Sequence, residues 1–252
     1  THNSLLNIVT FAAMLKQLPN LMTVGNLLCG CLAIVSVFHG QPVHAAWYVG
    51  IAAVLDFLDG FVARLVNGYS ELGKQLDSLA DMVTFGVVPG VILYHLMLKS
   101  SYFVTYENRD LFRVFKYYMF LVTAFSCIRL AKFNIDIRQT SYFIGVPTPI
   151  NTMAIVSLWL MVYYNQFGLQ HVILNPWVLV GIASISSALL IAEIPLISLK
   201  FKNFRFADNK GQFILLTLSI ILIPLLKFAA LPAILILYIL LSAIYPPVIK
   251  EK

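Results

Sequence analysis

The sequence predicts an all-α protein, a polytopic bundle of about eight transmembrane helices, and two observations point to that fold class. Of the 252 residues, 60% are hydrophobic and only 11% are charged, whereas soluble domains average about 45–50% apolar and about 25% charged residues. The apolar residues also form long runs, close to the 20 or so that a helix needs to cross a membrane, and these runs lack the two-residue alternation of a transmembrane barrel. This composition argues against a cytosolic enzyme and against a nucleic-acid-binding module, despite the net charge of +6.

Apolar segments of suitable length follow one another along the chain. We predict helical spans at residues 19–40, 44–65, 73–98, 114–133, 147–166, 175–199, 212–226 and 229–247. The seventh segment is short, and Pro224 and Pro232 blur its boundary with the eighth, so seven spans is the alternative.

Residues 1–16 precede the first of these segments and are too polar and too short to span. Their apolar positions recur at helical spacing, which predicts a juxtamembrane amphipathic helix that lies in the membrane interface. A signal peptide is the alternative, but no small-residue cleavage site follows before the next apolar run.

The lysine and arginine residues predict which side of the bundle faces the cytoplasm. Twelve of the 17 basic residues lie on one side of the bundle, in loops, termini and helix ends, and five lie on the other. The positive-inside rule assigns the first side to the cytoplasm of an inner membrane, together with both chain termini. The loop at 99–113 weakens this bias because it carries three basic residues on the opposite side, which Glu107 and Asp110 partly offset. We attribute the basic charge to topology and to attraction by anionic membrane lipid, not to nucleic acid.

Four aspartates lie within one stretch of 26 residues: Asp56, Asp59, Asp77 and Asp81. An ionised side chain at membrane depth costs about 2.5–3.5 kcal/mol even on permissive insertion scales. Residues three and four apart share a helix face, so Asp56 and Asp59 form one stripe and Asp77 and Asp81 another. The loop at 66–72 is short, which predicts antiparallel neighbouring helices whose stripes face each other.

Four carboxylates converging from two helices would form an all-oxygen site suited to Mg²⁺ or Mn²⁺. Small residues at Gly60, Ala63 and Gly73 would leave room beside it for a substrate. Arg64, one turn beyond the stripe, suits a phosphate or snorkels to the interface.

Two other interpretations of the acidic cluster stay open. Interhelical ion pairs are one, but only Arg64 and Lys74 are near enough in sequence to neutralise four acids. A proton or cation pathway of a transporter is the other. The position of the acids at one end of the bilayer, with no broken helix pair beside them, disfavours the transporter.

At these residues the sequence resembles the CDP-alcohol phosphotransferases. The family signature is Asp-x2-Asp-Gly-x2-Ala-Arg-x8-Gly-x3-Asp-x3-Asp, and residues 56–81 match it at every fixed position and gap length. The runs 19–30, 77–89, 129–134 and 143–149 resemble the integral-membrane phosphatidylserine synthases of this family, with Thr84 and Val88 in place of an expected Ser and Ala. The resemblance covers residues 17–200 and leaves 201–252 as a C-terminal cytoplasmic loop with the last two helices.

The resemblance implies a reaction in which L-serine displaces CMP from CDP-diacylglycerol to form phosphatidylserine at the cytoplasmic face. It implies one or two Mg²⁺ or Mn²⁺ ions held by Asp56, Asp59, Asp77 and Asp81, with Asp81 also acting as the general base. Nucleotide and diphosphate binding is assigned to Gly60, Ala63, Arg64 and Gly73. A homodimer is expected from the resemblance. Other acceptors, glycerol 3-phosphate or an inositol phosphate, remain the alternative within the family.

Several further residues are weaker candidates. Thr23 and Asn26 are polar positions inside the first span that would bind the diphosphate or nucleotide, or else hydrogen-bond between helices. Serine or lipid phosphate needs a fixed cation, and a cluster near the cytoplasmic end of the fourth span can supply one: Arg129, Lys132, Asn134 and Arg138. Arg129 is favoured among these because it sits a turn inside the span and its planar fork suits a carboxylate. Glu193 is expected inside the sixth span, with no partner evident.

Overall fold

The structure is a computed structural model that describes residues 2–100, 110–136, 143–197 and 209–246, with side chains described in these ranges from residue 15 onward except at 110–113 and 143. The chain divides into two compact units, residues 1–88 and 89–252. The described elements are helical except for one pair of two-residue strands. The predicted all-α membrane bundle is thereby confirmed.

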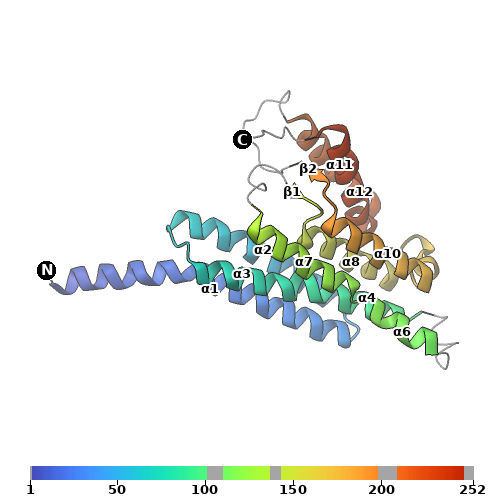
Figure 1. Ribbon diagram of the computed structural model, residues 1–252, viewed down its shortest axis with the longest axis horizontal. Coiled ribbons are helices and arrows are strands. Elements are labelled where there is room, and N and C mark those ends of the chain that lie inside the picture. The colour runs from blue at the N-terminus through green and yellow to red at the C-terminus, as the bar shows by residue number, and fades with distance from the viewer. Residues whose placement is uncertain (1, 101–109, 137–142, 198–208, 247–252) are drawn as a thin grey trace. The chain divides into compact units, whose positions relative to one another are not determined.

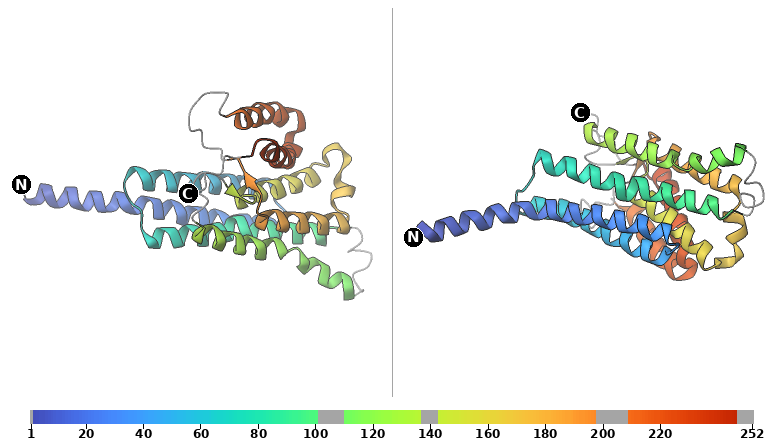
Figure 2. Two further views of the ribbon diagram at one scale, coloured as in Figure 1. Left: turned by 45° about the horizontal axis from the view of Figure 1, so that its top comes forward. Right: turned by 90° about the horizontal axis from the view of Figure 1, so that it is seen from below.

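The first unit is built around one long helix, α1 (His2–Phe38), against which α2 (Pro42–Leu65) and α3 (Glu71–Asp81) both pack. The three helices run alongside one another, and α1 extends beyond the other two at its N-terminal end (Figures 1 and 2). A π-helical turn, η1 (Met82–Val87), continues α3 and also contacts α1. α1 is therefore the common partner of every other element in this unit.

The predicted amphipathic segment 1–16 forms the first part of α1, which continues without a break to Phe38. Its expected position in the membrane interface stays a prediction. Pro19 lies inside this helix, which the helix tolerates although the proline has no N–H to donate.

Two turns connect the helices of the first unit. Gly40, at φ +67°, carries the chain from α1 to Pro42, the first residue of α2. After α2 ends, Asn67 adopts φ +47°, and the hydroxyl of Ser70 caps α3 by accepting a hydrogen bond from the Gly73 N–H at 3.0 Å. Such a cap satisfies an N–H that the first turn of a helix would leave without a partner.

Close approach of α1 and η1 depends on Gly30. A Cβ at this position would collide with the Thr84 side chain and lie 3.0 Å from the Thr84 Cα. Small residues commonly allow such approach between membrane helices. The contact places Asn26, one turn earlier on α1, against the end of α3.

The second unit contains the remaining helices. The helix that begins as α3 continues through η1 into α4 (Val88–Leu98), with which this unit starts. It is followed by α6 (Asp110–Tyr118), α7 (Leu121–Ile135), α8 (Thr148–Tyr163), η2 (Gln166–Gly168), α9 (Gln170–Ile173), α10 (Pro176–Ile191), α11 (Lys210–Leu226), η4 (Lys227–Ala229) and α12 (Ala230–Ile244). Strand β1 (Phe143–Ile144) lies between α7 and α8 in the chain, and strand β2 (Pro195–Leu196) follows α10. The two strands pair in antiparallel orientation.

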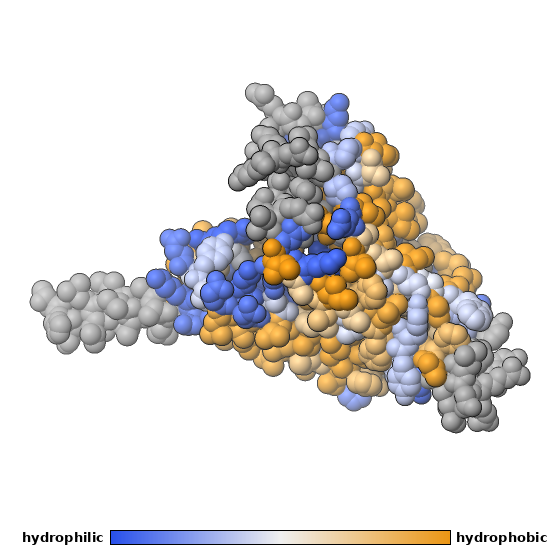
Figure 3. Space-filling view, in the orientation of Figure 1, coloured by the Kyte–Doolittle hydropathy of each residue, from blue (hydrophilic) through white to orange (hydrophobic). Residues whose placement is uncertain are grey.

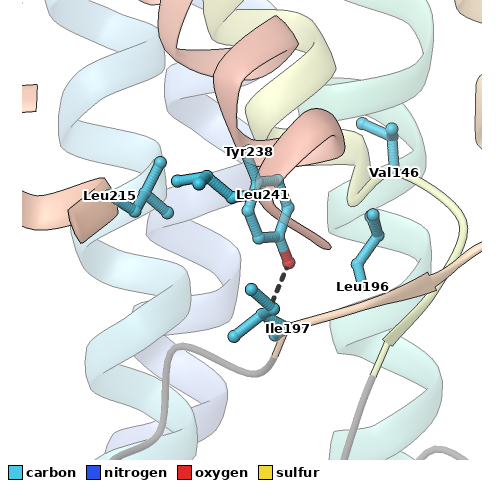
Figure 4. Packing of buried hydrophobic residues seen from close by; sticks show 6 residues of the cluster. All are labelled: Val146, Leu196, Ile197, Leu215, Tyr238 and Leu241. Atoms are coloured by element: carbon cyan, nitrogen blue, oxygen red, sulfur yellow. Dashed lines mark hydrogen bonds between the residues drawn. The ribbon is translucent and has the colours of Figure 1, made fainter. Parts of the chain in front are cut away.

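The strand pair is anchored by Gly145 and by the last two helices. Gly145 has φ +72°, and a Cβ there would lie 2.7 Å from the Leu190 carbonyl oxygen, so this position requires glycine. Tyr238 of α12 donates its hydroxyl to the Ile197 carbonyl at 2.8 Å, within a buried cluster (Figure 4). The residues of this cluster are Val146, Leu196, Ile197, Leu215, Tyr238 and Leu241.

Within the described ranges, five helical segments are long and apolar enough to cross a membrane: Leu15–Phe38, Pro42–Leu65, Glu71–Leu98, Val114–Ile135 and Lys210–Ile244. The last combines α11 and α12, and α8 and α10 are shorter apolar helices. Each predicted span thus corresponds to an apolar helix, while the number that cross the membrane stays a prediction. Much of the surface over the helices is hydrophobic, and hydrophilic residues gather where α2 and α3 are joined (Figure 3).

One predicted boundary is wrong. The sixth span was expected to reach residue 199 with Glu193 inside it, but α10 ends at Ile191 because Ala192 turns to φ −59°, ψ +135°. Glu193 therefore lies outside the helix, just before β2. Pro195 explains the early end, since a proline disfavours helical geometry at the residue before it and cannot donate to a helix.

Candidate functional site

The acidic residues of α2 and α3 come together in the first unit. Asp56, Asp59 and Asp77 each offer a carboxylate oxygen, and these oxygens all lie within 4.8 Å of one another. Asp56 is also within hydrogen-bonding reach of Asp77 and Asp81. Asp59 is buried and the other three are partly buried. The sequence prediction that the two stripes face each other is borne out in this geometry.

This arrangement fits a hard divalent cation. Carboxylate oxygens are the ligands that Mg²⁺ and Mn²⁺ prefer, and three acidic side chains packed this closely would repel one another if all were ionised without a cation. Asp56, Asp59 and Asp77 are the three residues whose geometry suits such an ion. Asp81 is the fourth acidic residue at the same place.

Two side chains of α1 hydrogen-bond directly to the carboxylates. The Thr23 hydroxyl donates to Asp59 Oδ2 at 2.6 Å, and the Asn26 amide donates to Asp81 Oδ1 at 3.1 Å. Of the two alternatives drawn from the sequence, interhelical hydrogen bonding is therefore the one present here. Contact of either residue with a diphosphate stays a prediction.

A cavity of about 470 Å³ adjoins the carboxylates. Volumes of about 300–1,000 Å³ are typical of small-molecule and cofactor sites. Six of its lining residues were candidates from the sequence: Thr23, Asp59, Gly60, Ala63, Gly73 and Asp77. The cavity and the acidic cluster are thus parts of one site.

The two glycines of this site contribute in different ways. A Cβ on Gly60 would meet nothing within 4 Å, so this residue keeps the cavity open as the sequence predicts. A Cβ on Gly73 would lie 2.9 Å from Asn20 Oδ1 and 3.0 Å from Ser70 Oγ. Gly73 therefore allows close packing of α3 against α1 and against its own cap.

Sequence reasoning missed part of the cavity wall. The additional lining residues come from the start of the first span, the loop between α2 and α3, and the first turn of α3: Pro19, Asn20, Gly68, Tyr69, Ser70, Glu71 and Lys74. The Asn-Gly pair at 67–68 and the capping Ser70 marked this segment as a turn, but nothing in its spacing showed that the turn folds over the carboxylates.

Two expected nucleotide-binding residues lie apart from this wall. Arg64 is exposed in the last turn of α2, and Asn26 is fully buried behind Asp81. Neither is among the residues that border the cavity in the described part of the chain. Their roles toward a nucleotide stay predictions.

The basic candidates belong to the second unit. Arg129 is buried on α7, with its guanidinium 5.8 Å from the centre of the Phe133 ring. Arg129 and Lys132 border a small cavity of about 30 Å³ together with Asp136 and Glu193. The partner environment of Glu193 that the sequence did not reveal is thus a set of charged residues. Asn134 is half-buried on the same helix, and Arg138 lies outside the described residues.

Comparison with known proteins decides the family. Residues 16–197, which include all four clustered acids, match the family model described as CDP-alcohol phosphatidyltransferase. The chain belongs to the CDP-alcohol phosphatidyltransferases. This membership in an enzyme family sets aside the transporter interpretation of the acidic cluster.

Three relatives of this phosphatidyltransferase illustrate the similarity. A Bacillus subtilis protein named CDP-diacylglycerol–serine O-phosphatidyltransferase is 35% identical over 146 residues, 57% of this chain and 76% of the relative. A Helicobacter pylori protein of the same name is 30% identical over 232 residues, 90% of this chain and 89% of the relative. The archaetidylserine synthase of Methanothermobacter thermautotrophicus is 26% identical over 162 residues, 62% of this chain and 64% of the relative.

We predict that Gly60→Leu will weaken the binding of cytidine diphosphate at least about tenfold, because a side chain here projects into the space beside the carboxylates and a misplaced ligand loses its polar contacts. The fold should persist, since the added Cβ meets open space. Titration calorimetry and thermal unfolding of the purified phosphatidyltransferase would measure both effects. Gly50→Leu, also in open space on α2, is the matched control, and equal CDP affinity in the two variants would place the nucleotide elsewhere.

Proposed function

We propose that the protein transfers the phosphatidyl group of CDP-diacylglycerol to the hydroxyl of L-serine, releasing CMP and forming phosphatidylserine. The observation that carries this proposal is the similarity over 90% of the chain to a relative named for that reaction. The acidic cluster beside a cavity of nucleotide size supports it independently.

We assign the metal-binding role to the four clustered acids. Asp56, Asp59 and Asp77 would hold one or two Mg²⁺ or Mn²⁺ ions, with Asp81 as a further ligand. A bound divalent cation would neutralise charge on the diphosphate and stabilise CMP as it leaves. The Thr23 hydroxyl would keep Asp59 in a ligating orientation, because it donates a hydrogen bond to one oxygen of that carboxylate.

Asp81 serves as the general base in this proposal. The serine hydroxyl oxygen attacks the phosphorus that carries the diacylglycerol, the bond from that phosphorus to the CMP oxygen breaks, and the hydroxyl proton passes to an Asp81 oxygen. General-base catalysis of this kind contributes about 10²–10⁴-fold to rate. The nucleotide would occupy the cavity beside Gly60, Ala63 and Gly73, with Arg64 toward a phosphate.

Serine presents a carboxylate and an ammonium group, so its site requires both signs of charge. Arg129 and Lys132 would bind the serine carboxylate. Asp136 and Glu193, which border the same small cavity, would bind the serine ammonium group. Asn134 and Arg138 complete the assigned set.

We expect Arg129→Gln to raise the KM for serine about tenfold or more with little change in the KM for CDP-diacylglycerol, since a hydrogen bond to a charged group contributes about 1.5–3 kcal/mol. Steady-state kinetics with each substrate varied would test this, and an equal rise in both constants would argue for a structural role.

The protein is an integral membrane protein, and we place it in the inner membrane as a homodimer. Both termini and the active site would face the cytoplasm, where soluble serine meets the lipid-linked diphosphate. Protease access to a C-terminal tag in sealed vesicles of known orientation and the mass of the detergent-solubilised particle would test these assignments. A tag exposed on the outer side, or a monomeric particle, would contradict them.

The deciding experiment measures CMP release by the purified protein from CDP-diacylglycerol with Mg²⁺ or Mn²⁺. L-serine, glycerol 3-phosphate and inositol phosphate are compared as acceptors, with EDTA as the metal-free condition. We expect CMP and phosphatidylserine with serine and metal alone. CMP formation only with another acceptor would keep the family chemistry and overturn the choice of serine, and undiminished activity in EDTA would overturn the metal assignment.

We predict that Asp81→Asn lowers kcat at least about 100-fold, because the amide keeps the shape of the side chain and cannot accept the hydroxyl proton. Binding of CDP-diacylglycerol should remain within a few-fold of the original. Gln75→Ala, an exposed position on the same helix, is the control that should retain activity. Parallel loss of substrate binding and turnover in Asp81→Asn would make Asp81 chiefly a ligand.

A further inference from the structure

The structure assigns Asn26 as a positioning residue: its side-chain amide holds one oxygen of Asp81 and so fixes the direction in which the carboxyl group faces the hydroxyl of the acceptor alcohol. This inference rests on the proposed role of Asp81 as general base and extends it to a residue outside the family signature. Asn26 itself touches neither the cavity nor the other three acids in the described contacts.

The hydrogen bond between these two residues is buried and its direction is defined. Asn26 has no exposed surface, and its Nδ2 lies 3.1 Å from Asp81 Oδ1. The NH₂ group of the Asn26 amide donates this hydrogen bond and the Asp81 oxygen accepts it. The amide oxygen Oδ1 is buried and has no hydrogen-bond partner among the residues that the structure describes. Among the described residues, the bond to Asp81 is thus the side-chain hydrogen bond of Asn26.

The backbone of Asn26 is held by the same segment that carries Asp81. Thr84, three residues after Asp81, donates its hydroxyl to the Asn26 carbonyl at 3.1 Å. Gly30 allows this approach, because any side chain there would collide with Thr84. Asn26 is therefore gripped at two points, by its amide on Asp81 and by its carbonyl on Thr84.

The π-helical turn η1 starts directly after Asp81 and contains Thr84. π-helical turns are rare and are frequently found at functional sites. This one brings the Thr84 hydroxyl, at the same register as the Asn26 carbonyl, into the contact with α1. The clamp thus fixes the end of α3, and with it the direction in which the Asp81 carboxyl group points.

An amide is suited to this task because it donates a hydrogen bond without exchanging a proton with the base. With Oδ1 held by Asn26, the Asp81 carboxyl group keeps one orientation in which to accept the alcohol proton. Supporting hydrogen bonds of this kind affect metal affinity or activity by about 10–100-fold when they are removed. The same arrangement occurs between α1 and α2, where the Thr23 hydroxyl donates to Asp59.

The test is the Asn26→Leu variant, which keeps the approximate volume of the side chain and removes the amide. We expect kcat to fall about 10–100-fold, whereas the KM for CDP-diacylglycerol and the CDP affinity measured by calorimetry stay within about threefold. Ser36→Ala, another buried polar residue of α1 whose hydroxyl bonds only its own helix in the described contacts, should leave all of these values unchanged. An unchanged kcat in Asn26→Leu, or a loss of CDP affinity equal to the loss of kcat, would overturn the assignment.

A double variant separates positioning from general support of the fold. If Asn26 acts through Asp81, then Asn26→Leu should cause no further loss of residual turnover in an Asp81→Asn background, since the group that it positions is already disabled. Additive losses would show that Asn26 acts independently and would overturn the proposal. Should Asn26→Leu fail to fold, Asn26→Ser, which is small and polar and too short to reach Asp81, is measured in the same way.

The outcome is separable from that of the proposed function. If another alcohol proves to be the acceptor, the serine assignment fails, and the same kinetic comparison is made with that alcohol. The calorimetric CDP affinity of the variants requires no acceptor and reports whether the nucleotide site is intact.

Discussion

The cost of placing four carboxyl groups inside an apolar bundle governs the first unit. Charges at membrane depth are tolerated only where a cation or hydrogen bonds compensate for the loss of water. Here two of the four carboxylates receive a donor from α1, through Thr23 and Asn26, and three lie close enough to share one ion. α1 is consequently more than a membrane anchor, because it supplies the Thr23 and Asn26 donors to acidic residues of α2 and α3.

The same requirement explains the small residues around the cluster. Gly30 lets η1 approach α1, and Gly73 lets α3 and its cap approach Asn20. Close packing at these points directs the polar atoms inward and leaves the open volume at Gly60, beside the carboxylates. In the proposed reaction, this open volume admits the lipid-linked nucleotide to the carboxylates.

The second unit uses a different device to order its polar residues. The strand pair, Gly145 and the buried Tyr238 bring the segment after α10 against α12. Here Glu193, which follows the end of α10, borders the same small cavity as Arg129 and Lys132. The family match ends at residue 197, yet α11 and α12 supply three of the six residues of the cluster that holds β2. The last two helices thus support the segment after α10 that carries Glu193.

The sequence by itself determined the helical membrane architecture, the order of the apolar helices and the four acids of the site. Each follows from local information: composition, run length and the helical spacing of Asp56, Asp59, Asp77 and Asp81. Tertiary structure decided which partners these residues meet. Asn26 read equally well as a nucleotide contact or an interhelical hydrogen bond, and only the packing of η1 on α1 placed it on Asp81. Tyr69 lies in the turn before α3, and no periodicity encodes the path of that turn over the site. Pro195 ends α10 before Glu193, but the residues that Glu193 meets depend on a strand pairing between residues about fifty positions apart along the chain. Sequence periodicity cannot register that pairing, since it reports only neighbours within a few turns.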